Sequence, residues 1–167
     1  MSSLLEVEEV PESNGEDLTL ESRRILAIDY GRRRIGLAIS DPTGTIATGL
    51  VTLEVRGVSD AIDRIAVLRG ELAYNRIVIG LPLRTSGEHG EMAGEVISFA
   101  EKLRAATGVP VETVDERFTS AEALRMLHQT GRKVKGNKGH VDRLAAEVLL
   151  RHYLEMMPHE PEGTQGE

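Results

Sequence analysis

The sequence predicts an α/β domain in which a mixed five-stranded sheet carries helices on both faces. Three short apolar segments come first, over residues 25–29, 34–41 and 46–53, and tight turns join them, as in an antiparallel meander. Helical and strand patterns then alternate along the rest of the chain, which implies parallel pairing through crossover helices. Strands four and five are therefore expected to run parallel to strand one.

The elements of the second half follow from apolar spacing and from stop signals. Apolar residues recur every three or four positions in the helical segments, and Gly108 with Pro110 ends one of them. The Thr119-x-x-Glu122 pattern matches a capping box and predicts the start of another helix. The predicted helices span about 59–74, 87–107, 119–129 and 141–156, and the two later strands span 77–79 and 111–115.

Size and composition indicate one domain, over residues 23–156. The chain has 167 residues and is 40% apolar, which is enough for a single core. It has no cysteine, so disulfides, thiolate metal ligands and a cysteine nucleophile are excluded. No apolar run approaches the roughly 20 residues that span a bilayer, and no signal-peptide pattern opens the chain, so we expect a cytoplasmic protein without a membrane partner.

Charge is distributed unevenly along the chain. The net charge is −7, but 11 of the 27 acids lie in residues 1–22 and 155–167, which contain no Lys or Arg. Residues 23–154 thus hold 16 acids and all 20 bases, for a net charge of +4. The segments 1–22 and 157–167 are expected to be disordered acidic tails. The mildly basic remainder is compatible with a nucleic-acid partner.

Acidic residues stand where predicted elements end or begin. Asp29 follows the first strand, Asp115 and Glu116 follow the fifth, and Asp142 opens the last helix. Ligands of open parallel sheets gather at the carboxyl ends of the strands, so these side chains are expected to meet there. Oxygen ligands without sulfur suit Mg²⁺ or Mn²⁺, and two such ions about 3.5–4 Å apart can hydrolyse a phosphodiester. The simpler alternative for Asp29 is a residue that caps a turn.

Basic residues flank these acids and are candidates for nucleic-acid contact. For the glycine-rich basic loop at 131–140, the alternative to nucleic-acid contact is a charged surface that is simply solvated. For Arg117, the alternative is an ion pair with Asp115 or Glu116. The candidates are Arg32, Arg33, Arg34, Arg117, Arg132, Lys133, Lys135 and Lys138.

Other motifs point to structure and not to chemistry. Gly80-Leu81-Pro82 predicts a tight turn after the fourth strand. The Gly131-x-x-x-x-Gly136 pattern lacks the Lys and Ser/Thr of a P-loop, and the five histidines show no metal-binding spacing.

Four segments together resemble the YqgF/RuvX family of Holliday junction resolvases. Residues 29–41 are similar to the family's D-x-G-x-x-R-I-G-x-A-x-S-D opening, and residues 79–87 to its V-G-L-P-L-x-x-x-G. Residues 115–121 resemble its D-E-R-x-T-[TS]-x, and residues 138–146 its K-x-x-V-D-x-x-A-A. The segments occur in the family's order and cover about residues 24–154. One departure is Arg84-Thr85-Ser86, where many relatives have Asn-Met-Asp.

The resemblance implies an RNase H-like three-layer fold and a nuclease that uses Mg²⁺ or Mn²⁺, with two ions expected. It implies a role in processing the 5′ end of pre-16S ribosomal RNA during ribosome biogenesis, with branched DNA as the alternative substrate. Asp29, Glu116 and Asp142 are the implied catalytic and metal-binding triad. Asp115 and Glu116 point to opposite faces of a strand, so only one of them can face the metals, and we take it to be Glu116.

Two other functions remain open from the sequence alone. Actin-like and sugar-kinase-like phosphotransferases also place Asp-x-Gly after a first strand, but they need two such domains to enclose ATP. A non-catalytic module that binds ribosomal RNA or an assembly partner is the third hypothesis. A resolvase of branched DNA needs two sites and so predicts a homodimer, whereas an RNA-trimming enzyme can act as a monomer.

Overall fold

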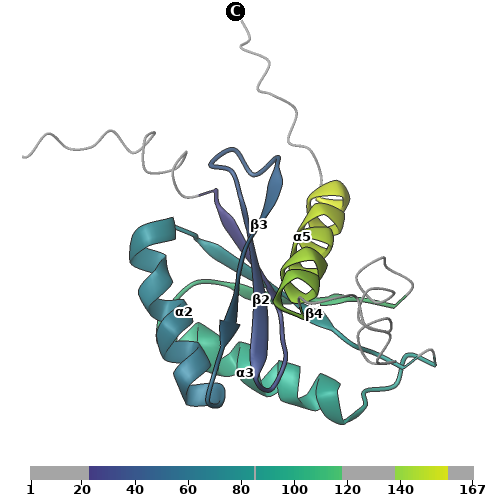
Figure 1. Cartoon of the computed structure of the whole chain (residues 1–167). Coiled ribbons are helices and arrows are strands. Elements are labelled where there is room, and N and C mark those ends of the chain that lie inside the picture. The colour runs from purple at the N-terminus through teal and green to yellow at the C-terminus, as the bar shows by residue number, and fades with distance from the viewer. Residues whose placement is uncertain (1–22, 85, 118–137, 158–167) are drawn as a thin grey trace, which may run out of the picture.

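The computed structural model describes residues 23–84, 86–117 and 138–157. Within them lie five strands and three helices (Figure 1). The elements are β1 (Ile25–Asp29), β2 (Arg34–Ser40), β3 (Ala47–Glu54), α2 (Val58–Leu72), β4 (Arg76–Leu81), α3 (Glu91–Thr107), β5 (Val111–Asp115) and α5 (Lys138–Met156). The predicted helix at 119–129, most of the basic loop and both predicted tails, apart from Met157, lie outside the described residues.

The five strands form one mixed sheet in the order β3-β2-β1-β4-β5. β1 pairs antiparallel with β2, and β2 pairs antiparallel with β3. β4 runs parallel to β1, and β5 runs parallel to β4. The predicted mixed α/β sheet is therefore confirmed, and β1 is its central strand. All five residues of β1 are buried, which explains why its sequence is a continuous apolar run up to Asp29.

Helices cover both faces of the sheet and create two apolar clusters. Leu26 and Ile28 of β1 pack with buried residues of α2 and α3 on one face. Ile25 and Ala27 pack on the other face with Ala146 and Leu149 of α5. Figure 1 shows α5 across the sheet from α2 and α3. The face that α5 covers is called the α5 face below, because the candidate site lies on it.

Two element boundaries differ from the predictions for physical reasons. α3 begins at Glu91 and not at 87, since residues 83–89 form a turn in which Leu83 bridges His89 and Gly87 N–H donates to the Arg84 carbonyl. β4 runs through Gly80 to Leu81, so the tight turn predicted at Gly80 is wrong. Gly80 and Leu81 still pair with Val114 and Asp115 of β5 and extend the strand.

The far end of α5 is held by polar contacts to the sheet. The Tyr153 hydroxyl donates to Glu112 Oε2 at 2.7 Å and accepts from Arg76 Nη1 at 3.0 Å. These contacts fix α5 against the starts of β4 and β5. They also place Glu112 on the side of β5 that faces α5. None of the helices among the described residues is both long and apolar enough to cross a membrane.

The β2–β3 connection is organised by Asp41, which gives a first testable prediction. The Asp41 carboxylate accepts N–H bonds from Thr43, Thr45 and Ile46 at 3.2, 2.7 and 2.7 Å, as well as a bond from the Thr43 hydroxyl. Because these bonds are lost, Asp41→Ala is expected to lower the free energy of unfolding by about 1–2 kcal/mol. Urea unfolding at neutral pH measures the loss.

The same carboxylate should make stability depend on pH. Burial raises the pKa of Asp41, but the bonds from Ile46, Thr43 and Thr45 outweigh burial and lower it to about 2. A depressed folded-state pKa stabilises the fold above the unfolded value near 3.8 and loses that effect as pH falls toward about 2. The stability difference between wild type and Asp41→Ala should therefore shrink between these pH values, and a constant difference would contradict this role.

Candidate active site

The first candidate residue, Asp29, ends β1 and faces α5. Side chains alternate along a strand, and Ile25 and Ala27 already belong to the α5 face. Asp29 continues that series and is only 5% exposed. A carboxylate held there by the central strand has little freedom to move. It is therefore fixed at the carboxyl end of β1, as the sequence predicted.

Glu116 reaches the same face from β5. Glu112 contacts Tyr153 of α5 and Val114 packs in the α5-side cluster, so alternate residues of this strand face α5. Glu116 is the next in that series, and its N–H donates to the Leu81 carbonyl at 3.2 Å. Its side chain is 2% exposed and lies directly over Gly80, because a Cβ added to Gly80 would be 1.6 Å from Glu116 Oε1.

Asp142 comes from the first turns of α5, where the helix passes closest to β2. A Cβ added to Gly36 would lie 2.0 Å from the Asp142 carbonyl oxygen, so the helix backbone rests on the bare surface of Gly36. The Asp142 carboxylate is 3.5 Å from Nε of Arg34, and its side chain is 15% exposed. The helix start therefore brings a third carboxylate to the α5 face.

Strand register places these contacts side by side. Gly36 pairs with Asp29, and the pair Ile28–Ile79 makes Asp29 and Gly80 the next residues on β1 and β4. We call Gly36, Asp29 and Gly80 the glycine–aspartate row. Neighbouring strands lie about 4.8 Å apart. Gly80, which lies under the Glu116 side chain, is thus about one strand spacing from Asp29. Gly36, which lies under the backbone of Asp142, is at the same spacing on the other side of Asp29.

The donor atoms of this site fit a hard divalent cation, since all three side chains are carboxylates. Two of them are almost fully buried on the same face, which is unfavourable for charged groups unless something compensates. As the side chains stand, the described residues contain no group of three or more His, Cys, Asp or Glu side chains placed to hold a metal ion. Asp142 instead engages Arg34. A cation that uses Asp142 would compete with this ion pair.

Asp115 lies on the opposite face of β5 from Glu116 and forms an ion pair. Arg117 Nη2 is 2.7 Å from Asp115 Oδ2, and Arg117 Nε donates to both carboxylate oxygens at 3.2 and 2.9 Å. These hydrogen bonds lower the pKa of Asp115, and burial only partly opposes them. The guanidinium lies against Gly87, where an added Cβ would be 2.9 Å from Arg117 Nη1. Asp115 therefore orients Arg117 beside the turn at 83–89.

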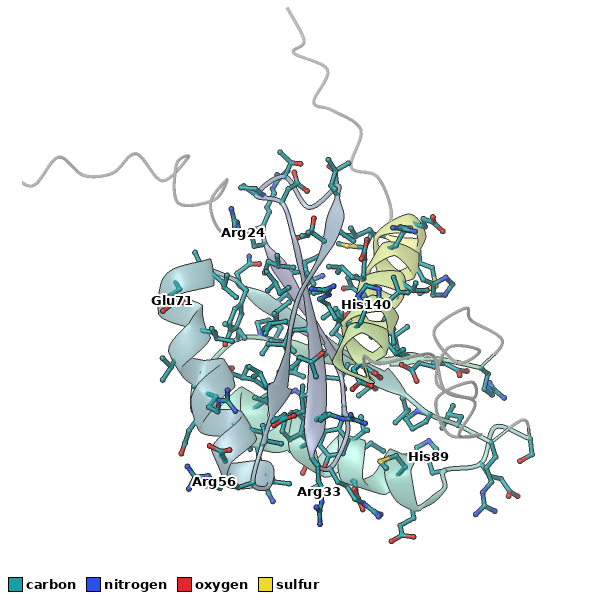
Figure 2. All side chains as sticks on the ribbon, in the orientation of Figure 1. Arg24, Arg33, Arg56, Glu71, His89 and His140 are labelled. Carbon is teal, nitrogen blue, oxygen red and sulfur yellow. The ribbon has the colours of Figure 1, made fainter. Side chains whose placement is uncertain are left out.

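The three arginines after β1 have different surroundings. Arg32 turns to the α3 side, where its Nη2 is 2.7 Å from Glu95 and 3.5 Å from Glu91, and this bonding lowers the pKa of Glu95. Arg33 projects from the turn between β1 and β2 (Figure 2). Arg34 forms an ion pair with Asp142, a carboxylate of the α5 face.

The predicted basic loop can be followed only at its end. Arg132, Lys133 and Lys135 lie outside the described residues. Lys138 is the first residue of α5, which begins three residues earlier than predicted, and its side chain is likewise outside the described part.

The role of the two glycines in the row was not predicted from the sequence. A glycine inside a strand often marks the close approach of another group, and that signal was present at both positions. Gly36 lay within the second predicted strand, and Gly80 directly followed the fourth.

Comparison with known proteins decides the family. The family model described as "RuvX: Holliday junction resolvase" matches residues 23–156. The chain belongs to the RuvX family. This membership confirms the predicted resemblance and, with it, the class of enzyme, a nuclease. Enzymes of this class depend in general on a divalent metal ion, which agrees with the oxygen-only donors of the candidate site.

The matches to named relatives cover most of this RuvX-family chain and most of each relative's own length. A protein of Chloroflexus aggregans named "Putative pre-16S rRNA nuclease" is 41% identical over 136 residues, covering 81% of this chain and 96% of the relative. A protein of Koribacter versatilis with the same name is 43% identical over 135 residues, covering 79% and 86%. Among solved structures, Thermus thermophilus RuvC in complex with a Holliday junction substrate is similar at 16% identity, with a TM-score of 0.48 and coverage of 78% and 92%.

Proposed function

We propose that this RuvX-family chain is a metal-dependent endonuclease that processes the 5′ end of pre-16S ribosomal RNA. The observation that carries the proposal is the burial of Asp29 and Glu116 on one face, where Glu116 lies over Gly80, the neighbour of Asp29 on the adjacent strand. Paired buried carboxylates at the carboxyl edge of a sheet are costly for folding alone. Their placement is explained if they hold a cation that acts on a phosphodiester.

Asp29, Glu116 and Asp142 would hold Mg²⁺ or Mn²⁺, with two ions as the expected number. When bound, such ions activate water and stabilise the leaving oxygen of a phosphodiester. The residues of the chain supply the rest of the site. Asp29 is fixed by β1, Glu116 by β5 and the surface of Gly80, and Asp142 by the start of α5 on Gly36. Glu116 and not Asp115 is the ligand in this proposal, because Asp115 faces away and pairs with Arg117.

Basic side chains would hold the substrate backbone next to this site. Arg34 lies at the carboxylates and Arg117 is oriented beside the turn at 83–89. Arg33 projects from the β1–β2 turn (Figure 2). Arg32, Arg132, Lys133, Lys135 and Lys138 complete the proposed nucleic-acid contacts, although Arg32 must then act from the α3 side. A Holliday junction is the second candidate substrate, because the matching family is described by that activity.

A cleavage assay tests the proposal. The wild-type chain is incubated with a precursor 16S RNA fragment, a single-stranded RNA and a four-way DNA junction, each with Mg²⁺, Mn²⁺ or excess EDTA. We expect cleavage of the RNA precursor with either ion and none with EDTA, since in this proposal the bound ion activates the attacking water. Preferential cleavage of the junction would select the second candidate, and that result should coincide with a dimer in solution.

Two outcomes would contradict the proposal. Cleavage that persists in EDTA would exclude the metal role of the three carboxylates. Tight RNA binding without cleavage under every metal condition would favour a non-catalytic module that binds ribosomal RNA. Gel-shift measurements on the same RNA distinguish this second outcome from a protein that simply fails to bind.

A further inference from the structure

Gly80 interrupts an otherwise well-filled strand. Ile77, Val78 and Ile79 of β4 are fully buried, and Leu81 on the other side of Gly80 is nearly so. A glycine in the interior of a strand is less favourable than an alanine, because it loses more conformational freedom on folding. The presence of glycine at position 80 therefore calls for a structural explanation.

The backbone conformation of Gly80 does not require a glycine. The positive-φ glycines of the described residues are Gly44, Gly87 and Gly108, so Gly80 has a conformation open to other residues. Gly80 also keeps its place in the ladder, paired with Val114. What excludes a side chain is the space above it.

The side chain of Glu116 fills that space. A Cβ on Gly80 would lie 1.6 Å from Glu116 Oε1, 2.2 Å from its Cδ and 2.8 Å from its Cγ. The backbone of Glu116 cannot retreat freely, because its N–H donates to the Leu81 carbonyl at 3.2 Å. Any side chain at position 80 must therefore displace the carboxylate itself.

We infer that Gly80 is a positioning residue that seats the Glu116 carboxylate beside Asp29. The inference rests on the proposed nuclease function and adds a determinant of its site. The bare Cα of Gly80 leaves room for the carboxylate above β4, the strand next to Asp29. The three atoms nearest to a methyl group there all belong to the Glu116 side chain, so the methyl group displaces that carboxylate first.

The test compares Gly80→Ala with a variant designed to undo its effect. Glu116→Asp shortens the side chain by one methylene and vacates part of the space that the methyl group introduced by Gly80→Ala needs. Displacement of a reacting group by about 1 Å can cost on the order of 10²-fold in rate. We therefore expect Gly80→Ala to lower kcat by that order with little change in KM, and to weaken Mn²⁺ binding measured by calorimetry.

The double variant Gly80→Ala/Glu116→Asp should be more active and bind Mn²⁺ more tightly than Gly80→Ala alone. Gly70→Ala is the matched control, because a Cβ at Gly70, which lies in α2, meets nothing within 4 Å. It should leave kcat, KM and Mn²⁺ affinity unchanged.

A folded Gly80→Ala with wild-type kcat and Mn²⁺ affinity would overturn the inference, and so would a double variant no better than the single one. If Gly80→Ala fails to fold, thermal melting of the double variant decides, since recovery of Tm supports the clash with Glu116 and an equal loss refutes it. Failure of the proposed function is distinct, because the wild type itself would then not cleave, while Mn²⁺ affinity and Tm still report on position 80.

Discussion

An Asp29→Asn variant is expected to cleave its substrate on the order of 10²–10³-fold more slowly than the wild type, a loss like that of one preorganised hydrogen-bond donor from an oxyanion hole. Asparagine has the shape of aspartate but lacks the negative charge that holds a divalent ion. Because Asp29 lies in the middle of the glycine–aspartate row, its charge is close to both other carboxylates. The loss should appear in kcat and not in substrate affinity.

Glu112→Gln is the matched control for this prediction. Glu112 lies on the same face of the sheet but at its opposite end, where it accepts a bond from Tyr153 that an amide oxygen can also accept. Single-turnover cleavage and thermal melting of both variants separate catalysis from folding. Equal activity of Asp29→Asn and wild type, with both proteins folded, would remove Asp29 from the active site.

Gly36→Ala is expected to be among the most destabilising single substitutions in the described sheet. Its Cβ would lie 2.0 Å from the Asp142 carbonyl oxygen, 2.4 Å from the carbonyl carbon and 3.0 Å from the Arg143 nitrogen. These are backbone atoms that no rotamer change can move, so α5 must shift away from β2. Overpacking of this kind costs about 1–3 kcal/mol or more, and we expect the upper part of that range.

Urea unfolding measures this loss, with Gly70→Ala again as the control. Alanine in place of a helical glycine should stabilise the protein by up to about 1 kcal/mol. Gly36→Ala should also reduce cleavage, since the shift carries Asp142 away from the row. A Gly36→Ala protein as stable as the wild type would contradict the contact between α5 and β2.

The fold could be predicted from local patterns because each element carried its own signal. The apolar run of β1, ended by Asp29, identified a buried strand, and Gly108 ended α3 as expected, where it adopts a left-handed conformation. The turn assigned to Gly80 failed because a glycine shortly before a proline is an ambiguous signal. The pairing of Gly80 with Val114 and of Leu81 with Asp115 shows that the strand continues.

The sequence predicted which acidic residues stand at the ends of elements, but it did not predict their contacts. Alternation along a strand separates Glu116 from Asp115, but it cannot say which of them faces α5. That choice depends on the contact between Glu112 and Tyr153, residues 41 positions apart. The ion pair of Arg34 with Asp142 likewise depends on where the last helix lies, which no local pattern records.

The lack of a side chain at Gly36 and Gly80 has a consequence for duplicated copies of this protein. A copy released from selection for cleavage no longer needs room for a carboxylate over β4. Once Glu116 is replaced by a smaller residue, a side chain at position 80 fills the strand and removes the conformational cost of glycine. Joint loss of Gly80 and Glu116 would therefore mark a descendant that has kept the fold and abandoned the chemistry.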